Sequence, residues 1–234
     1  MLHAFSLYNQ TLSEIPKSKV LINTLNAHCY NMAVKDAIYQ EALLKSDILI
    51  PDGVSIVWAI NWLTGQKLKK IAGADLFFYE MQRMQQFGGK CFFLGSSNST
   101  LNKIKERVSL DYPNIKVQTY SPPFKAEFTD EDNEIMLEVI NAVRPNVLMV
   151  GMTAPKQEKW TYKNYNRIQA EHICCIGAVF DFYAGTINRA PQWIIKIGME
   201  WSYRMIKEPR RMWRRYLAGN LLFILHIIRE KFKS

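Results

Sequence analysis

The fold is decided by residues 147–176, which read VLMVGMTAPKQEKWTYKNYNRIQAEHICCI. The apolar run 147–150 predicts a strand, 151–155 a loop, 156–169 a helix, and the next apolar run, ending at Ile176, a second strand. Strands of four or five residues that are apolar throughout are typical of a parallel sheet buried on both faces. This unit therefore predicts an α/β fold.

The same alternation of short apolar runs and longer helical patterns fills the chain on the N-terminal side. It predicts a doubly wound, mostly parallel, Rossmann-like sheet in a domain that covers residues 1–193. Such sheets bind ligands beyond the carboxyl ends of their strands, so the loops after those ends are the candidate sites. The predicted strands are 20–22, 47–50, 91–94 and 115–119, and the predicted helices are 27–44, 54–63, 74–86, 101–110 and 131–143.

Positive charge is concentrated at the C-terminal end. The 234 residues carry a net charge of +9, and residues 196–234 hold ten Lys and Arg against three Glu, which is +7. Aromatic side chains and the aliphatic run 221–225 lie among these cations, a mixture that suits an anionic membrane surface or a ligand combining phosphate with lipid. We therefore predict a basic, amphipathic, helical appendage over residues 194–234. A solvated basic face or a nucleic-acid-binding surface are the alternatives, and the aliphatic run argues against nucleic acid.

Composition excludes several classes of protein. No window of about 18 apolar residues predicts a transmembrane helix, and the N-terminus lacks the pattern of a secretory signal. The four cysteines form no C-x-x-C pair, which favours reduced thiols in a cytoplasmic protein. The histidines are scattered, so no metal site is predicted. No G-x-G-x-x-G is present, so no dinucleotide cofactor is expected, and a Rossmann-type oxidoreductase is the weaker alternative.

Polar residues follow the first two predicted strands. Thr24 and Asn26 could hold a sugar or a nucleotide through neutral hydrogen bonds, or Asn26 could cap the next helix. Asp52, followed by Gly53, is placed as a general base for a sugar hydroxyl. Taken alone, Asp52 fits a helix cap or an Asp-Gly turn better.

Further candidates lie in later loops. Gly95 precedes a predicted helix whose N–H groups could face phosphate, and Lys156 and Gln157 open another helix at a strand end. Arginine forks bind diphosphate oxygens in pairs, and several C-terminal arginines share one helical side. The C-terminal candidates are Arg204, Arg211, Arg214 and Arg215.

Taken in order, several short motifs resemble the WecG/TagA/CpsF glycosyltransferases over residues 15–220. They are Thr24-x-Asn26, Pro51-Asp52-Gly53, Gly73-Ala74-Asp75-Leu76, Phe93-Leu94-Gly95, Ala154-Pro155-Lys156-Gln157-Glu158, Phe180-Asp181-x-x-Ala184-Gly185, Arg189-Ala190-Pro191 and Glu200-Trp201-x-x-Arg204-x-x-x-Glu208-Pro209-Arg210-Arg211. The resemblance implies a metal-independent, inverting transfer from a UDP-sugar to a sugar on an undecaprenyl diphosphate carrier.

The resemblance also implies roles for individual residues. Asp52 matches the proposed base, which shifts the interpretation of this residue from cap to catalyst. Thr24, Asn26 and Gln157 match pocket residues, and the C-terminal arginines match an appendage that closes over the site. Lys70 stands where the family often has arginine, so the charge is kept and the bidentate fork is lost.

The function expected from the sequence is transfer of N-acetylmannosamine from UDP-ManNAc to a GlcNAc-diphosphate lipid in cell-envelope polysaccharide or teichoic acid synthesis. A UDP-glucose or UDP-ManNAcA transferase of the same family, and a basic nucleic-acid-binding module, are the alternatives. The expected partners are the UDP-sugar, the lipid-linked acceptor and an anionic membrane, with a homo-oligomer left open and no nucleic acid. The expected location is peripheral, on the inner face of the bacterial plasma membrane.

Overall fold

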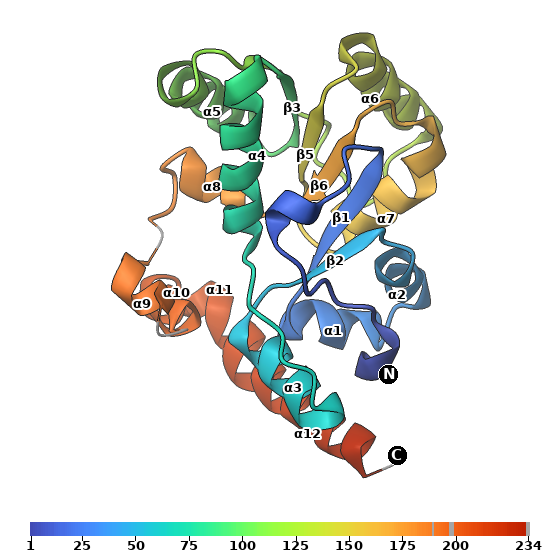
Figure 1. Cartoon of the computed structure of the whole chain (residues 1–234), viewed down its shortest axis with the longest axis vertical. Coiled ribbons are helices and arrows are strands. Elements are labelled where there is room, and N and C mark those ends of the chain that lie inside the picture. The colour runs from blue at the N-terminus through green and yellow to red at the C-terminus, as the bar shows by residue number, and fades with distance from the viewer. Residues whose placement is uncertain (189, 197–198, 233–234) are drawn as a thin grey trace.

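The computed structural model describes residues 1–188, 190–196 and 199–232, and for a few of these it describes the backbone alone. Six strands form one sheet with helices on both faces, and the C-terminal helices extend from one end of the molecule (Figure 1). The residues described by their backbone alone are Gln192, Lys196, Arg211, Arg214 and Arg215.

The sheet has the strand order β2-β1-β6-β5-β3-β4, and every pair of neighbours is parallel. This confirms the predicted doubly wound α/β fold. Each predicted strand is found with its ends shifted by no more than one residue, except that the first strand continues to Leu25, beyond its predicted end at 22. The strands are β1 (Val20–Leu25), β2 (Ile48–Pro51), β3 (Lys90–Gly95), β4 (Lys116–Tyr120), β5 (Val147–Gly151) and β6 (His172–Cys175).

The helices of the α/β body follow the predicted order with three differences. The helix expected over 27–44 is two helices, separated at 34–36, because Asp36 caps the second by accepting a hydrogen bond from the Tyr39 N–H at 3.0 Å. The helix expected over 156–169 ends at Asn164, and a short helix lies where a loop was expected after β6. The helices are α1 (Ala27–Ala33), α2 (Ala37–Leu44), α3 (Val54–Thr64), α4 (Gly73–Phe87), α5 (Asn98–Asp111), α6 (Asp130–Val143), α7 (Lys156–Asn164) and α8 (Val179–Tyr183).

Alternate side chains of the central strands enter two separate cores. Phe93 and Met149 pack with α4, α5 and α8 on one face of the sheet, whereas Phe92 and Leu148 pack with α6 and α7 on the other. Because successive side chains of a strand point to opposite faces, a run that is apolar throughout fills both cores at once.

A buried ionic network ties the amino end of the sheet together. Glu80 of α4 is fully buried and lies 2.7 Å from Nδ1 of His172, the first residue of β6. Arg83 donates to the same carboxylate at 2.9 Å, and Nε2 of His172 lies 2.9 Å from the Pro16 carbonyl oxygen. This network lies at the edge of the sheet opposite the strand ends that carry the candidate site.

The C-terminal segment is helical, as predicted, and its last helix packs into the body. It comprises α9 (Gln192–Lys196), α10 (Glu200–Lys207), α11 (Pro209–Trp213), a π-helix (Arg214–Ala218) and α12 (Gly219–Lys231). Helix α12 lies beside α1 and α3 (Figure 1). The Phe223 ring of α12 is buried 5.3 Å from the ring of Tyr30, and Asn31 donates to the Gly219 carbonyl oxygen at 2.7 Å.

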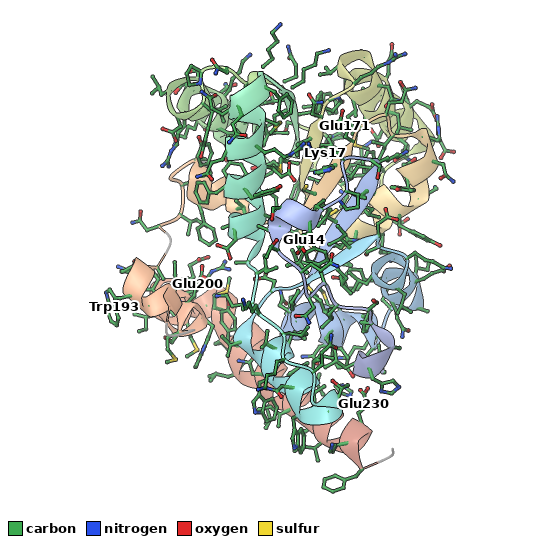
Figure 2. All side chains as sticks on the ribbon, viewed as in Figure 1. Glu14, Lys17, Glu171, Trp193, Glu200 and Glu230 are labelled. Carbon is green, nitrogen blue, oxygen red and sulfur yellow. The ribbon has the colours of Figure 1, made fainter. Side chains whose placement is uncertain are left out.

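The end of α12 is also bound to the start of the chain. The carboxylate of Glu230 accepts hydrogen bonds from the Leu2 N–H at 2.9 Å, the His3 N–H at 3.1 Å and the Tyr30 hydroxyl at 3.1 Å. Figure 2 shows Glu230 on α12 near the N-terminal segment. Burial alone would raise the pKa of Glu230, but the two backbone N–H groups and the N-terminal ammonium lower it to about 2. The predicted domain division at residue 194 stays a prediction, with α12 a firmly packed part of the segment beyond it.

Candidate active site

The carboxyl ends of the central strands are level with one another. Leu25 of β1 pairs with Pro51 of β2, and Gly95 of β3 pairs with Gly151 of β5. Neighbouring strands lie about 4.8 Å apart. The loops that follow these ends therefore share one edge of the sheet, where doubly wound folds bind their ligands.

Asp52 lies at this edge, in the turn between β2 and α3, and is partly exposed. Its backbone N–H donates to the Leu25 carbonyl oxygen at 2.8 Å, which fixes the turn against the end of β1. Helix α3 begins at Val54 and its N-cap residue is Gly53, so of the two structural alternatives for Asp52 the helix cap is not found and the Asp-Gly turn is.

Gly53 has a φ of +130°, which side chains rarely adopt, and a β-carbon there would lie 3.7 Å from Cβ of Asn26. The turn after β2 and the turn after β1 are therefore in contact. The position of Gly53 explains why glycine follows Asp52: the backbone must turn sharply to carry the carboxylate and then start α3.

The two candidates from the first strand occupy different environments. Asn26 caps α1, and its Oδ1 accepts from the Cys29 N–H at 3.0 Å, so the capping alternative is confirmed for this residue. Thr24 lies inside β1 opposite Ile50, because the strand continues to Leu25 beyond its predicted end at 22. Both residues stand at the edge that carries Asp52.

The backbone conformation at position 95 explains why this residue is glycine. It has a φ of +113°, and a β-carbon there would lie 2.6 Å from the Gly151 carbonyl oxygen, closer than such contacts allow. The next helix, α5, is capped by Ser97, whose hydroxyl accepts from the Thr100 N–H at 3.2 Å. The phosphate-facing role of Gly95 stays a prediction. Glycine is needed here because β3 and β5 approach each other too closely for a β-carbon.

Gln157 and Glu158 form a buried polar pair at the start of α7. They are 3% and 1% exposed, and Nε2 of Gln157 donates to Oε1 of Glu158 at 2.9 Å. Burial raises the pKa of Glu158 to about 7, against the opposing effect of the hydrogen bond from Gln157. Within the described part of the chain, Gln157 Oε1 and Glu158 Oε2 have no hydrogen-bond partner.

This pair belongs to the same edge of the sheet. Gly177, two residues beyond the end of β6, has a φ of +52°, and a β-carbon there would lie 3.6 Å from both Nε2 and Oε1 of Gln157. Gln157 was predicted as a site residue from the sequence, whereas Glu158, its neighbour in the same motif, was not. The burial of the Glu158 carboxyl group beside the Gln157 amide is visible only in three dimensions.

The lysine candidates lie further from this pair. The Lys156 ammonium donates to the Lys125 carbonyl oxygen and lies 3.6 Å from the ring centroid of Phe128, and burial lowers its pKa. It therefore faces the segment before α6, and the structure does not bring it together with Gln157. Lys70 is partly exposed in the segment between α3 and α4.

Among the arginine candidates, Arg204 has a side chain whose contacts the structure describes. It is 9% exposed, its guanidinium carbon lies 5.3 Å from the ring centroid of Phe182, and Nη2 lies 3.9 Å from the Glu208 carboxylate. Its Nε and Nη2 have no hydrogen-bond partner in the described part of the chain. Arg204 thus brings a buried positive charge from α10 to α8. The side chains of Arg211, Arg214 and Arg215 lie outside the described residues.

The cysteine thiols are arranged as core residues. All four cysteines are free and buried, and burial raises the pKa of Cys91, Cys174 and Cys175 well above the usual range.

Among the residues that the structure describes, no group of three or more His, Cys, Asp or Glu side chains could hold a metal ion. Within the same residues, no helix combines the length and apolarity needed to cross a bilayer.

A parallel, doubly wound sheet with a carboxylate and an amide at its carboxyl edge is typical of enzymes that bind nucleotides or sugars. The family model of the glycosyl transferase WecG/TagA/CpsF family matches residues 3–234. The chain therefore belongs to this family of glycosyltransferases, which confirms the resemblance found in the ordered motifs.

Relatives named for a specific transfer align with most of the chain. An N-acetylglucosaminyldiphosphoundecaprenol N-acetyl-beta-D-mannosaminyltransferase of Bacillus subtilis (strain 168) is 30% identical over 204 residues, 86% of this chain and 77% of the relative. The enzyme of the same name from Bacillus spizizenii (strain ATCC 23059 / NRRL B-14472 / W23) is 30% identical over 84% of this chain and 74% of the relative. That from Staphylococcus aureus (strain MW2) is 26% identical over 92% and 82%.

Proposed function

We propose that this chain transfers N-acetylmannosamine from UDP-ManNAc to a GlcNAc residue on undecaprenyl diphosphate, with inversion at the transferred carbon. The observation that carries the proposal is alignment over most of both chains with relatives named for this transfer. The level strand ends with Asp52 beside Asn26 support it, because they offer a carboxylate and neutral polar groups at the ligand-binding edge.

Asp52 is the proposed catalytic base. Its carboxylate takes the proton of an acceptor hydroxyl as the hydroxyl oxygen forms a bond to the anomeric carbon of the donor sugar. The bond between that carbon and the UDP oxygen breaks in the same step, and UDP leaves with the electron pair. A single displacement from the face opposite UDP inverts the configuration.

Positive side chains and helix N-termini are proposed to stabilise the departing diphosphate without a metal ion. Lys70 and Arg204 are the described candidates, and Arg211, Arg214 and Arg215 join them from the C-terminal segment. Lys156 would contribute only after leaving the Lys125 carbonyl oxygen to which its ammonium donates. Thr24, Asn26, Gly53, Gly95 and Gln157 are the proposed neutral contacts. An arginine fork holds diphosphate oxygens in pairs, which suits the lipid-linked acceptor.

Incubation with a panel of UDP-sugars and a short-chain GlcNAc-diphosphate lipid, followed by mass spectrometry, tests this proposal. We expect a product heavier by one N-acetylhexosamine with UDP-ManNAc, and equal rates with and without EDTA. A product formed with UDP-glucose or UDP-ManNAcA alone would select another sugar of the same family. Loss of activity in EDTA would contradict the metal-independent mechanism.

An anionic membrane surface is the proposed second partner, and α12 supports it. Phe223 and Ile227 point from α12 into the core, whereas the opposite side of the helix is aliphatic and exposed. The exposed side chains recur at helical spacing on one side, which Arg229 and Lys231 flank. They are Leu221, Ile224, Leu225 and Ile228 of α12, together with Leu217 of the preceding π-helix and Phe232 directly after α12. Aliphatic groups flanked by cations are typical of helices that lie in an anionic membrane interface.

Helix α3 adds aromatic groups beside this stripe. Trp58 and Trp62 are exposed and stacked with their ring centroids 5.4 Å apart. The Lys231 ammonium donates to the Trp62 carbonyl oxygen at 3.1 Å, which joins the C-terminal ends of α3 and α12. Tryptophan favours the headgroup layer of a bilayer. The enzyme is therefore proposed to bind peripherally on the inner face of the plasma membrane, and a homo-oligomer stays a prediction.

The double change Leu221→Ser and Leu225→Ser is expected to weaken binding to phosphatidylglycerol vesicles by tenfold or more. Each leucine buried in the interface contributes about 1.5 kcal/mol or more, and the loss of two exceeds a factor of ten. Vesicle sedimentation at fixed salt measures the change. Leu110→Ser is the matched control, because Leu110 is an exposed leucine on α5 at the far end of the molecule (Figure 1). Equal loss in the control would contradict a surface on α12.

A further inference from the structure

Glu158 is a carboxyl group in an unfavourable place. It is fully buried at the start of α7, and its hydrogen bond from Gln157 leaves the second carboxyl oxygen without a partner in the described part of the chain. Burial of such a group penalises its charged form and costs stability unless something compensates. A glutamine of the same shape would carry no such penalty.

The groups around Glu158 do not neutralise its charge. Tyr39 of α2 and Cys175 of β6 face it, and burial raises the pKa of both, so both stay neutral at physiological pH. Thr161, one turn further along α7, donates its hydroxyl to the Gln157 carbonyl oxygen of the backbone at 2.9 Å. What Glu158 does contact is the side-chain amide of Gln157, which lies against Gly177 at the ligand edge of the sheet.

We propose that Glu158 is a positioning residue, which accepts the N–H of Gln157 so that the Gln157 carbonyl oxygen faces the substrate as a hydrogen-bond acceptor. The amide of a free glutamine can turn either way. An ionised carboxyl group can only accept, so it holds Nε2 toward itself and directs Oε1 away. The substrate group that Gln157 then recognises is a donor, an N–H such as that of an acetamido group or of uracil. This inference rests on the proposed function of the same site.

Stability and activity are expected to move in opposite directions in Glu158→Gln. The folded-state pKa of Glu158, about 7, lies above the value of 4.5 for an exposed glutamate. The folded wild type therefore loses stability as pH rises from about 4.5 to 7. The variant lacks this loss. At pH 8 its unfolding equilibrium constant is expected to be at least tenfold lower than that of the wild type, and the difference is expected to vanish below pH 4.5.

Kinetics and binding complete the test. In Glu158→Gln the KM of the substrate that Gln157 contacts is expected to rise about fivefold to tenfold with a smaller change in kcat, because the amide at 158 can bind Gln157 in either orientation. The wild-type KM is expected to fall as pH rises through about 7, and the variant is expected to lack this dependence. Glu106→Gln, an exposed carboxylate on α5, is the control for loss of one charge.

Calorimetry with UDP and with UDP-ManNAc identifies the substrate N–H group that donates a hydrogen bond to Gln157. If Glu158→Gln binds both ligands more weakly, Gln157 contacts uracil. If it binds only UDP-ManNAc more weakly, Gln157 contacts the acetamido group of the sugar donor. If only the KM of the lipid changes, Gln157 contacts the acceptor. Unchanged binding and kinetics in Glu158→Gln would overturn the proposal, and so would loss of activity that follows loss of stability. The stability and UDP-binding measurements need no turnover. If the chain transfers another sugar they still test Glu158, and the proposed function fails separately.

Discussion

Replacing Asp52 with Asn is expected to lower kcat by about a thousandfold while UDP-ManNAc still binds. A positioned base contributes about 10² to 10⁴ to the rate, and an amide cannot take the proton of the acceptor hydroxyl. The backbone N–H of Asp52 donates to the Leu25 carbonyl oxygen and Gly53 is the N-cap of the next helix, and neither of these backbone features involves the carboxylate. Single-turnover product formation measures the rate, and calorimetry measures donor binding.

Two further variants serve as comparisons for Asp52→Asn. Asp52→Glu keeps a base at a displaced position and is expected to retain part of the activity. Asp130→Asn removes an exposed carboxylate from the first turn of α6 and is expected to leave transfer unchanged. Normal turnover by Asp52→Asn would exclude Asp52 as the base. A parallel loss of donor binding would assign it to substrate binding instead.

Phe223→Ala is expected to lower the free energy of unfolding by about 3 to 5 kcal/mol. The Phe223 side chain is fully buried between α12 and the body, where its ring meets Tyr30 edge to face. Truncation to alanine removes this contact and leaves a cavity that the surrounding helices fill only in part. Urea unfolding of the two proteins measures the difference, which for this chain amounts to a large share of total stability.

The matched control lies two residues away on the same helix. Leu221 is 61% exposed, so Leu221→Ala is expected to leave the free energy of unfolding nearly unchanged. Equal stability of Phe223→Ala and the wild type would show that α12 does not pack on α1 in solution. For the same reason, deletion of residues beyond 194 would damage the core as well as remove cations, so point changes on the outer side of α12 test membrane binding more cleanly.

The sheet was predictable because its strands carry their own signal. Runs such as 91–94 and 147–150 are short, apolar throughout and followed by glycine, which is typical of a strand buried on both faces. The break between α1 and α2 was missed because Val34 and Lys35 suit a helix, and the decisive event is a cap by Asp36. Where two good helices are adjacent, periodicity alone does not locate the boundary.

The packing of α12 was not predictable from the sequence. The run 219–231 is apolar on two sides, and the sequence does not say which side meets the protein. The answer depends on Tyr30 and Asn31, which lie about 190 residues earlier in the chain. Asp52 was found because it directly follows a strand, whereas Glu158 was missed because a charged residue in the first turn of a helix is normally exposed.

Helix α3 places the proposed base and the proposed membrane-facing tryptophans a short way apart in the chain. Asp52 lies two residues before the helix begins at Val54, and Trp58 lies four residues into the helix, about 6 Å along its axis at a rise of about 1.5 Å per residue. Should Trp58 lie among lipid headgroups, as proposed, Asp52 would lie near the level at which a lipid-linked diphosphate leaves the bilayer. We therefore expect the base to act on a sugar close to that diphosphate, which is the acceptor that an early step of glycan assembly provides.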